Sequence, residues 1–425
     1  MYDESPEDIN LAGALVENFD VSGSLVGGLA SLFIDDNALV SNINILNGAY
    51  LQGDIISLWD PTDDRVQVPE GVSATSLVTQ LTFGLAKNAD GSANSETADP
   101  QFNLAYHGNI YALPAKQEQT PGWAKIQMRV AGGTLSFNGT AKLLSVTVDE
   151  GATLKGNATY DLTVLQSPET NEIEIGGDFI NRGTLAPGNS LGQITVNGNF
   201  VLASTGHLLM EFDAEGKTDQ LIVSKLLDGS NQEMTKLTGE QVTVQPAQSY
   251  YGNGTLTIDL SHMVQKANGD DEESTTSVSL VNPTIQGDVS ATLTQSGSVA
   301  DNVLTLHTTR ASDAYSRLAE SQEAATVAAA FDRHAGNAQG AMQDLVATID
   351  FSEASTLNAA FESLSPDLYA RAGAAALTAQ QIITQAVLRE QVKGAPHGAS
   401  LYVVPLGGHT DRTREGFKST YGGVL

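Results

Sequence analysis

The chain has no cysteine among its 425 residues. This absence excludes disulfide bonds, thiolate-ligated metal sites and cysteine nucleophiles. It also suits a chain that crosses a membrane unfolded, because a disulfide formed early would block threading. Aromatic residues make up only 6% of the chain, whereas 41 residues are glycine. This mixture favours many short, closely packed strands over a large aromatic core.

Basic residues are also scarce. Against 50 Asp and Glu there are 21 Lys and Arg, which gives a net charge of -29. Such a chain repels phosphate backbones, so we expect no nucleic-acid partner. No apolar run is long enough for a lipid-facing helix. The opening MYDESPEDIN has neither the basic nor the apolar region of a secretory signal, which leaves a cytoplasmic protein or a piece of a longer chain.

From about residue 10 to residue 308, short alternating segments are separated by Gly, Asn and Asp, which predicts strands. Four segments share one shape, NGAYLQGD (47–54), GGTLSFNG (132–139), EGATLKGN (150–157) and RGTLAPGN (182–189). A second repeat aligns GGDFINRG (176–183) with NGNFVLASTG (197–206), about 20 residues later, a spacing found in stacked repeat proteins. We therefore expect a mainly β fold, a right-handed parallel β-helix with Gly and Asn at the corners, where φ is positive. The side chains expected inside are Val146, Val148, Leu154, Leu185, Ile194, Val196, Phe200, Leu221 and Val223.

The segment GNSLG (188–192) allows three interpretations, a phosphate loop, a serine nucleophile in a sharp turn, or a corner of the coil. A nucleophile elbow needs a following helix and a partnered histidine, but a strand follows here and His207 stands in its own coil. A phosphate loop needs Gly-Lys-Ser/Thr before a helix, which is missing. We favour the corner of the coil. The residues then expected to have a structural role in this coil are Gly183, Leu185, Pro187, Gly188, Ser190, Gly192, Ile194, Val196, Gly198 and Phe200.

Metal chemistry finds little support in the sequence. The seven histidines are scattered, and no two stand at ligand spacing on one helix. The acidic segments WDPTDD (59–64) and KANGDDEESTTS (266–277) do not match a calcium loop and favour solvated loops, as does Lys87–Pro100. We therefore expect no catalytic residue, no metal and no cofactor, and a protein that is not an enzyme.

The periodicity becomes helical at about residue 309, with helices predicted at 310–337, 341–349 and 353–364. The clearest helix follows at 366–393, with Ser365 as N-cap, Pro366 at its first position and Gly394 after its end. At 1.5 Å per residue it is about 42 Å long, enough to cross a bilayer, yet it carries many polar side chains. Two interpretations stay open, a helix inside a water-lined pore, with Tyr369, Gln381 and Arg389 among its residues, or a surface helix packed on a neighbour. Strands are predicted again at 400–408 and 417–425.

The order of these parts resembles the autotransporters of Gram-negative bacteria (type V secretion). The resemblance is carried by GTLAPGNSLGQITVNGNF (183–200), DQLIVSK (219–225), VTVQPAQ (242–248), ADNVLTLHTTRASDAYSRLA (300–319) and LSPDLYARAGAAALTAQQIITQAVLREQ (364–391). It extends from about residue 176 to the end and is looser upstream. It implies β-helical passenger coils at 1–175, autochaperone-like coils at 176–308, a helical linker at 309–394, and the first strands of a truncated outer-membrane β-barrel at 395–425.

The resemblance also implies a location and partners. The passenger would stand outside the cell, and the full-length barrel would engage the outer membrane and its barrel-assembly machinery. A barrel of about 12 strands needs roughly 120 residues or more, and about 30 follow Gly394, so we expect a fragment. The expected function is a non-catalytic stalk and folding module that presents an adhesin-like or other effector passenger, whose host ligand no motif names. The alternative is the C-terminal fragment of an autotransporter enzyme, a subtilisin-like protease or a carbohydrate-active β-helix, with its catalytic part upstream.

Overall fold

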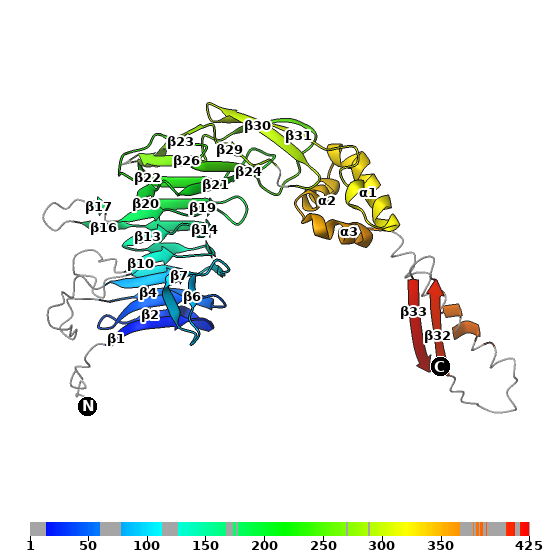
Figure 1. Ribbon diagram of the computed structural model, residues 1–425, viewed down its shortest axis with the longest axis horizontal. Helices are drawn as coiled ribbons and strands as arrows, with labels where there is room; N and C mark the ends of the chain where they lie inside the picture. Colours follow the sequence, from blue (N-terminus) through cyan, green and yellow to red (C-terminus); the bar gives the residue numbers. More distant parts are fainter. Residues whose placement is uncertain are drawn as a thin grey trace, which may run out of the picture. The chain divides into compact units, whose positions relative to one another are not determined.

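The structure is a computed structural model that divides into two compact units, Met1–Val289 with Thr294–Thr308, and Ser290–Leu293 with Thr309–Leu425. It describes residues 14–59, 78–112, 126–166, 173–175, 177–268, 271–287, 290–365, 405–412 and 417–424, and the helical positions 377, 380, 381, 383–385 and 388. In the described part the chain is mainly β, as the sequence predicts. Within the described residues, helices occur only in the second unit (Figure 1).

A seven-stranded parallel sheet forms one side of the first unit (Figure 1). Its strands, in spatial order, are β29 (Thr284–Ile285), β24 (Val242–Pro246), β21 (His207–Phe212), β19 (Thr184–Pro187), β14 (Thr153–Gly156), β11 (Thr134–Phe137) and β8 (Asn103–Tyr106). Each strand pairs with the strand of the next repeat, so one leucine from each of the five strands β8 to β21 falls into a single row. That row is Leu104, Leu135, Leu154, Leu185 and Leu208, all buried. Aligned apolar side chains of this kind hold successive repeats together.

A 15-stranded sheet forms the rest of the stack, and only its β26–β27 pair is antiparallel in the described residues. Its main path is β1 (Leu15–Val21), β3 (Leu39–Ile45), β5 (Thr79–Phe83), β10 (Ile126–Val130), β13 (Ser145–Val148), β18 (Asp178–Asn181), β20 (Gln193–Leu202), β15 (Ala158–Asp161), β12 (Thr140–Lys142), β9 (Ile110–Ala112), β4 (Tyr50–Ser57) and β2 (Ser24–Ile34). Beyond β20 lie β22 (Gln220–Asp228), β26 (Val264–Asn268) and β27 (Asp271–Ser277).

Strand β20 joins two parallel ladders within this sheet. Its first half pairs with β15, and its second half pairs with β18. Gly198 lies between the halves, and a Cβ there would stand 2.9 Å from the Leu162 Cβ. Glycine therefore lets one strand turn from the first ladder into the second at a point where the next layer is close.

The strand register is confirmed for three of the four segments of the first repeat and for the second repeat, whereas the segment 47–54 lies on β4, which pairs with β2 and β9 in the other sheet. Thr134, Thr153 and Thr184 pair in succession, and Phe179 of β18 pairs with Phe200 of β20. The aligned glycines Gly53 and Gly156 have φ values of 102° and 114°, a region that favours glycine. A Cβ at Gly156 would stand 2.2 Å from the Phe137 carbonyl oxygen, so the repeat keeps glycine where two layers nearly touch.

The nine side chains predicted to lie inside are all buried. One of them, Phe200, ends an aromatic row of Tyr106, Phe137, Tyr160, Phe179 and Phe200, with successive ring centroids 5.1–5.8 Å apart. Ring contacts along this row add to the energy of burial.

Short antiparallel elements lie against the stack. One is a three-stranded sheet of β25 (Gly254–Asp259), β31 (Val303–Thr309) and β30 (Thr294–Ala300), and others are the pairs β6–β7 (Leu85–Lys87, Ala93–Ala98) and β16–β17 (Thr163–Gln166, Ile173–Ile175). The short strands β23 (Lys236–Thr238) and β28 (Ser279–Val281) pair in parallel. The loops predicted at 87–100 and 266–277 are thus largely hairpins, because β6 pairs with β7 in the first and β26 pairs with β27 in the second.

The second unit contains α1 (Gln322–His334), α2 (Ala341–Asp350) and α3 (Ala354–Ser363), with 3-10 turns η2 (Ser316–Leu318) and η3 (Ala335–Asn337). Tyr315, Phe331 and Phe361 pack together, with centroids 5.4–6.4 Å apart. The predictions at 341–349 and 353–364 are confirmed. The helix predicted from residue 310 is wrong in its first part, because Ser321 caps α1 by accepting a hydrogen bond from the Ala324 N–H.

Most of the helix predicted at 366–393 lies outside the described residues. Its described positions, from Leu377 to Leu388, are helical and exposed. Of the helices in the described part, none combines the length and the apolar character that a bilayer span requires. Strands β32 (Pro405–Arg412) and β33 (Phe417–Val424) form an antiparallel hairpin, so the strands predicted near the end are confirmed in type.

Candidate functional site

The predicted coil residues lie on β19, on β20 and in the loop between them. Leu185, Ile194, Val196 and Phe200 have no exposed surface, and Gly183, Pro187, Gly188 and Gly198 are also buried. Ser190 is exposed, and Gly192 is half-buried. The structure therefore brings these residues together as one layer, with the apolar members inside and the loop at its rim.

The loop from Gly188 to Gly192 is a tight corner. Gly188 has φ of 83°, and a Cβ there would stand 1.9 Å from the Ser190 carbonyl oxygen. At Gly192 a Cβ would stand 2.4 Å from the Gly188 Cα. The strand β20 starts directly after it. Of the three interpretations of this segment, the geometry favours the corner, since both glycines are needed for the chain to approach itself.

His207 does not form a catalytic pair with Ser190. Its Nδ1 lies 3.3 Å from the Glu240 carbonyl oxygen, and its Nε2 lies 2.9 Å from the Thr243 Oγ1. Both ring nitrogens therefore contact acceptor or donor groups of β24 and of the turn before it. A serine nucleophile needs a base within hydrogen-bond reach, and this histidine does not supply one.

A buried carboxyl group, Asp219, fixes this corner to the next layer. Its Oδ1 accepts from the Gly192 N–H at 2.8 Å and its Oδ2 from the Glu211 N–H at 2.7 Å. Burial raises the pKa of Asp219 to about 8, and the nearby Glu211 charge adds to this, while the two N–H donors oppose it. Asp219 was not predicted from the sequence, in which its only signal is an acidic side chain at the start of the segment DQLIVSK.

We expect Asp219→Asn to flatten the pH dependence of stability between about pH 4 and pH 8. The folded pKa lies above the unfolded value of 3.8, so the neutral carboxyl favours the fold. Its contribution is fully present below about pH 4 and is lost as pH rises through about 8. Urea midpoints measured across this range should fall for the unchanged protein more than for the variant. Parallel profiles for the two proteins would show that Asp219 does not titrate in this way.

The residues predicted for a pore helix are only partly placed. Ser365 is buried, with its N–H donating to the Glu362 carbonyl oxygen. Gln381 is helical and exposed. Pro366, Tyr369 and Arg389 lie outside the described residues. The choice between a pore helix and a surface helix therefore stays a prediction.

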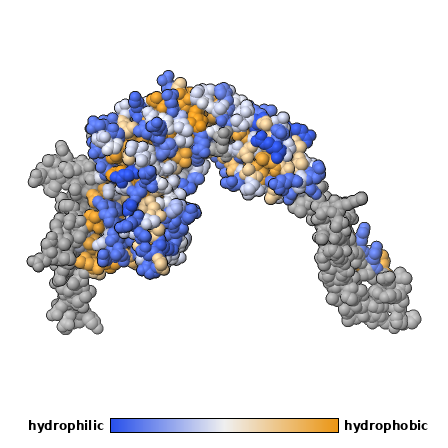
Figure 2. Space-filling model, in the orientation of Figure 1, coloured by the Kyte–Doolittle hydropathy of each residue, from blue (hydrophilic) through white to orange (hydrophobic). Residues whose placement is uncertain are grey.

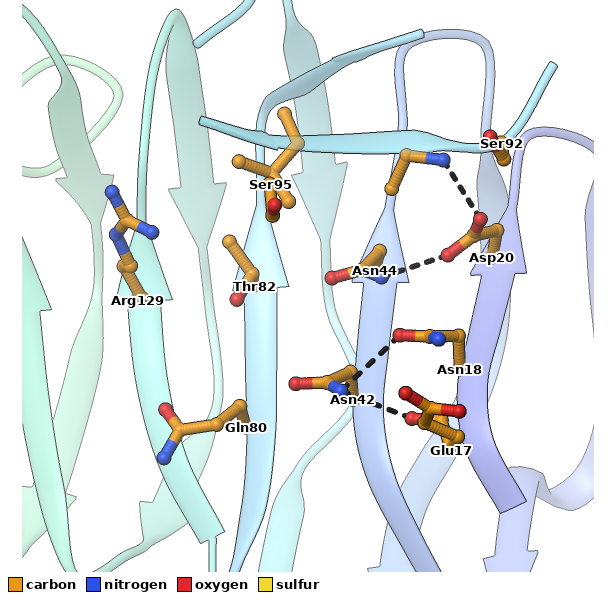
Figure 3. A pocket seen from close by; sticks show the side chains of 12 residues that line it. Glu17, Asn18, Asp20, Asn42, Asn44, Gln80, Thr82, Ser92, Ser95 and Arg129 are labelled. Carbon is orange, nitrogen blue, oxygen red and sulfur yellow. Dashed lines mark hydrogen bonds between the residues drawn. The ribbon is translucent and has the colours of Figure 1, made fainter. Parts of the chain in front are cut away.

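A polar groove lies on the outer face of β1, β3, β5 and β10, with a volume of about 520 Å³ (Figure 3). Two rows of paired residues form its floor. The first row is Asn18, Asn42 and Gln80, and the second is Asp20, Asn44, Thr82 and Arg129. Members of a row sit on adjacent parallel strands, about 4.8 Å apart, and face the same side of the sheet.

Hydrogen bonds fix the asparagines of the floor. The Asn42 Nδ2 donates to the Glu17 carbonyl oxygen at 3.0 Å and to the Asn18 Oδ1 at 3.2 Å. The Asn44 Nδ2 donates to the Asp20 Oδ1 at 2.7 Å. Both amide oxygens then point toward β5 (Figure 3). Asparagine was expected at corners, and these two residues instead stand within a strand on its outward face.

The hairpin β6–β7 walls the groove at the carboxyl ends of the strands (Figure 3). Its Ala93 N–H donates to the Asp20 Oδ2 at 2.7 Å. Leu85 at its base is buried against Leu46 and Ala131. On β10, the Arg129 Nε donates to the Asp149 Oδ2 at 2.6 Å. The wall and the cation are therefore held in place without a ligand.

The described part of the chain contains no group of three or more His, Cys, Asp or Glu side chains arranged to hold a metal ion. In the comparisons with known proteins, no family model matches the chain and no curated protein matches it.

Proposed function

We propose that the chain is the non-catalytic stalk and folding module of a Gram-negative autotransporter, in which residues 176–246 act as the folding nucleus. In this proposal the parallel stack is a right-handed β-helix, the passenger stands outside the cell, and a full-length barrel engages the outer membrane and its assembly machinery. One observation carries the proposal. The two longest strands with alternate side chains buried, β20 and β22, lie in the C-terminal part of the stack.

Strand length and burial together distinguish this part. Strands β20 and β22 have 10 and 9 residues, with alternate side chains buried, whereas β10 to β19 have three to five. Strand β2 is also long, at 11 residues, but Val26, Leu29 and Phe33 are 62%, 78% and 55% exposed. Apolar atoms are visible at the surface near these first strands (Figure 2). Because apolar burial drives folding, the C-terminal strands are the better nucleus.

The C-terminal end of the stack is also capped. Ile258 of β25 and Leu304 and Leu306 of β31 are buried. The Asn302 side chain accepts from the Leu280 N–H at 2.7 Å, which ties this sheet to β28. Repeat proteins need such end structures, since the last repeat has no further neighbour to cover its core.

The segments after the stack agree with the same proposal. A three-helix unit follows β31, and helical, exposed positions follow it with Gln380, Gln381 and Gln385 among them. A β-hairpin comes last. This order of stack, helices and hairpin is the order that the resemblance implies, with a polar helix entering the translocation pore.

Pulsed hydrogen exchange during refolding tests the nucleus. The unchanged chain is unfolded in denaturant, diluted, and labelled after increasing delays. Amides of β19 to β24 should become protected before those of β1 to β5, because parallel strands gain stability only on an already folded layer. Protection that appears first in β1 to β5, or everywhere together, would remove the basis for a C-terminal nucleus.

A further inference from the structure

We propose that the polar groove bounded by β1, β3, β5, β10 and the β6–β7 hairpin binds a short neutral oligosaccharide. This site is separate from the C-terminal coils, and it does not depend on the secretion route or on the folding nucleus. It would give the stack a recognition surface of its own.

The groove offers oriented acceptors to sugar hydroxyl groups. The amide nitrogens of Asn42 and Asn44 are engaged with β1, so each amide oxygen faces the groove as an acceptor (Figure 3). An amide oxygen that accepts from a hydroxyl adds roughly 0.5–1.5 kcal/mol when it is already in position. Because both groups are held before binding, little side-chain entropy is lost.

Donors stand opposite these acceptors. Arg129 lines the groove with its Nε on Asp149, and one of its outer guanidinium nitrogens points toward Thr82 (Figure 3). Thr82 and Ser95 supply hydroxyl groups that both donate and accept. A sugar presents hydroxyl groups of the same dual character on every ring. The lining therefore complements a polyhydroxylated ligand at several points.

Other ligand classes fit the lining poorly. Ligand pockets for apolar molecules are mostly apolar, whereas the only larger apolar side chain lining this groove is Leu85. Glu17 and Asp20 repel phosphate and other anions, as does the net charge of -29. No group of three acidic or histidine side chains that could hold a metal occurs in the described residues. A neutral, hydroxyl-rich molecule meets none of these obstacles.

The dimensions also suit a short sugar chain. From β1 to β10 the floor crosses three gaps between strands, or roughly 14 Å at ~4.8 Å each. The spacing between two adjacent strands is close to the length of a pyranose ring. Successive sugar rings can therefore contact successive strands. The volume of about 520 Å³ lies within the range of small-ligand sites, roughly 300–1,000 Å³.

A glycan array tests the proposal with the purified chain. The array carries neutral gluco-, galacto-, manno- and N-acetylglucosamine oligosaccharides beside sulfated and sialylated ones, and the strongest neutral glycan is then titrated by calorimetry. We expect saturable binding of a neutral glycan. Binding of no glycan, or of anionic glycans alone, would overturn the proposal.

Three variants locate the binding. Thr82→Val keeps the side-chain shape, and Asn42→Ala removes one acceptor; each should weaken the titrated affinity about tenfold. Thr147→Val on β13 is the matched control, since it continues the Thr82–Arg129 row outside the groove lining, and its affinity should not change. Thermal unfolding shows whether each variant folds. If the Asn42→Ala protein does not fold, the Thr82→Val protein alone decides the test. Unchanged affinity in a folded Thr82→Val protein would place the glycan elsewhere and refute the site.

Discussion

Leu185→Asp should unfold the C-terminal part of the stack. Leu185 is fully buried and pairs between Leu154 and Leu208, so its side chain contacts the layers on both sides. Replacing it removes about 2–5 kcal/mol of packing, as large-to-small core substitutions do. It also buries a carboxylate with no cation provided, which costs several kcal/mol more unless the group stays protonated. The sum rivals the roughly 5–15 kcal/mol that holds a whole domain together.

Urea unfolding followed by circular dichroism measures this loss. Phe200→Asp should act in the same direction, because Phe200 ends the aromatic row and pairs with Phe179. Ala186→Asp is the matched control, since it lies beside Leu185 on β19 but faces outward and is half-buried. A Leu185→Asp protein as stable as the Ala186→Asp protein would show that the leucine row does not hold the layers together.

Under the proposed function, the same substitution also separates stability from export when it is made in a chain fused to a signal peptide and a full barrel. In a Gram-negative host, Leu185→Asp should stall surface display, measured with an antibody against the passenger on intact cells. Ile43→Asp, at an equally buried position on β3, should reduce display less, because the proposed nucleus lies downstream of it. Equal display of both variants and of the unchanged protein would sink the folding-nucleus proposal.

The repeat-based part of the fold could be predicted because its signal is local. The threonine-leucine pairs at 134–135, 153–154 and 184–185 mark the same place in successive layers, and the structure pairs them in register. Phe179 and Phe200 do the same for the second ladder. Equivalent positions of successive repeats carry the same residue types because they pack in the same way. Comparing the repeats within one sequence therefore reveals the strand register.

The groove could not be predicted, because its members come together only through pairing between distant strands. Asn44 meets Thr82 and Arg129 through a register that the repeats near residue 180 do not specify. The alternation in SNINIL gave the one available signal, with Asn42 and Asn44 on the face opposite Ile43 and Ile45. Asp219 was hidden for the same reason, since its two donors belong to other turns of the chain.

In the second unit, the change with the largest expected effect is Asp350→Ala. Asp350 has no exposed surface, and its carboxylate pairs with the Arg310 guanidinium, which is 4% exposed. It also accepts from the Tyr315 hydroxyl at 2.7 Å and from the Thr292 hydroxyl at 2.5 Å. Burial and the Asp350 charge raise the pKa of Tyr315, so its hydroxyl keeps the proton that it donates. One carboxylate therefore organises three partners.

Removing that carboxylate leaves the Arg310 charge buried without its counter-ion, which costs about 3–5 kcal/mol. Hydrogen exchange should show the amides of α1, α2 and α3 losing protection by two or more orders of magnitude, while β19 to β22 keep theirs. Asp344→Ala is the matched control, an exposed acid on the same helix α2, and should change protection little.

The double variant Arg310→Met with Asp350→Leu distinguishes a costly orphaned charge from a lost attraction. If the damage comes from the orphaned charge, removing both charges should recover much of the stability, because a buried ion pair often contributes little net energy relative to apolar side chains of similar size. If the double variant is as unstable as Asp350→Ala, the hydrogen bonds to Tyr315 and Thr292 carry the stability instead. Asp350→Asn then separates those two donors from the charge, since its amide oxygen still accepts while the negative charge is gone.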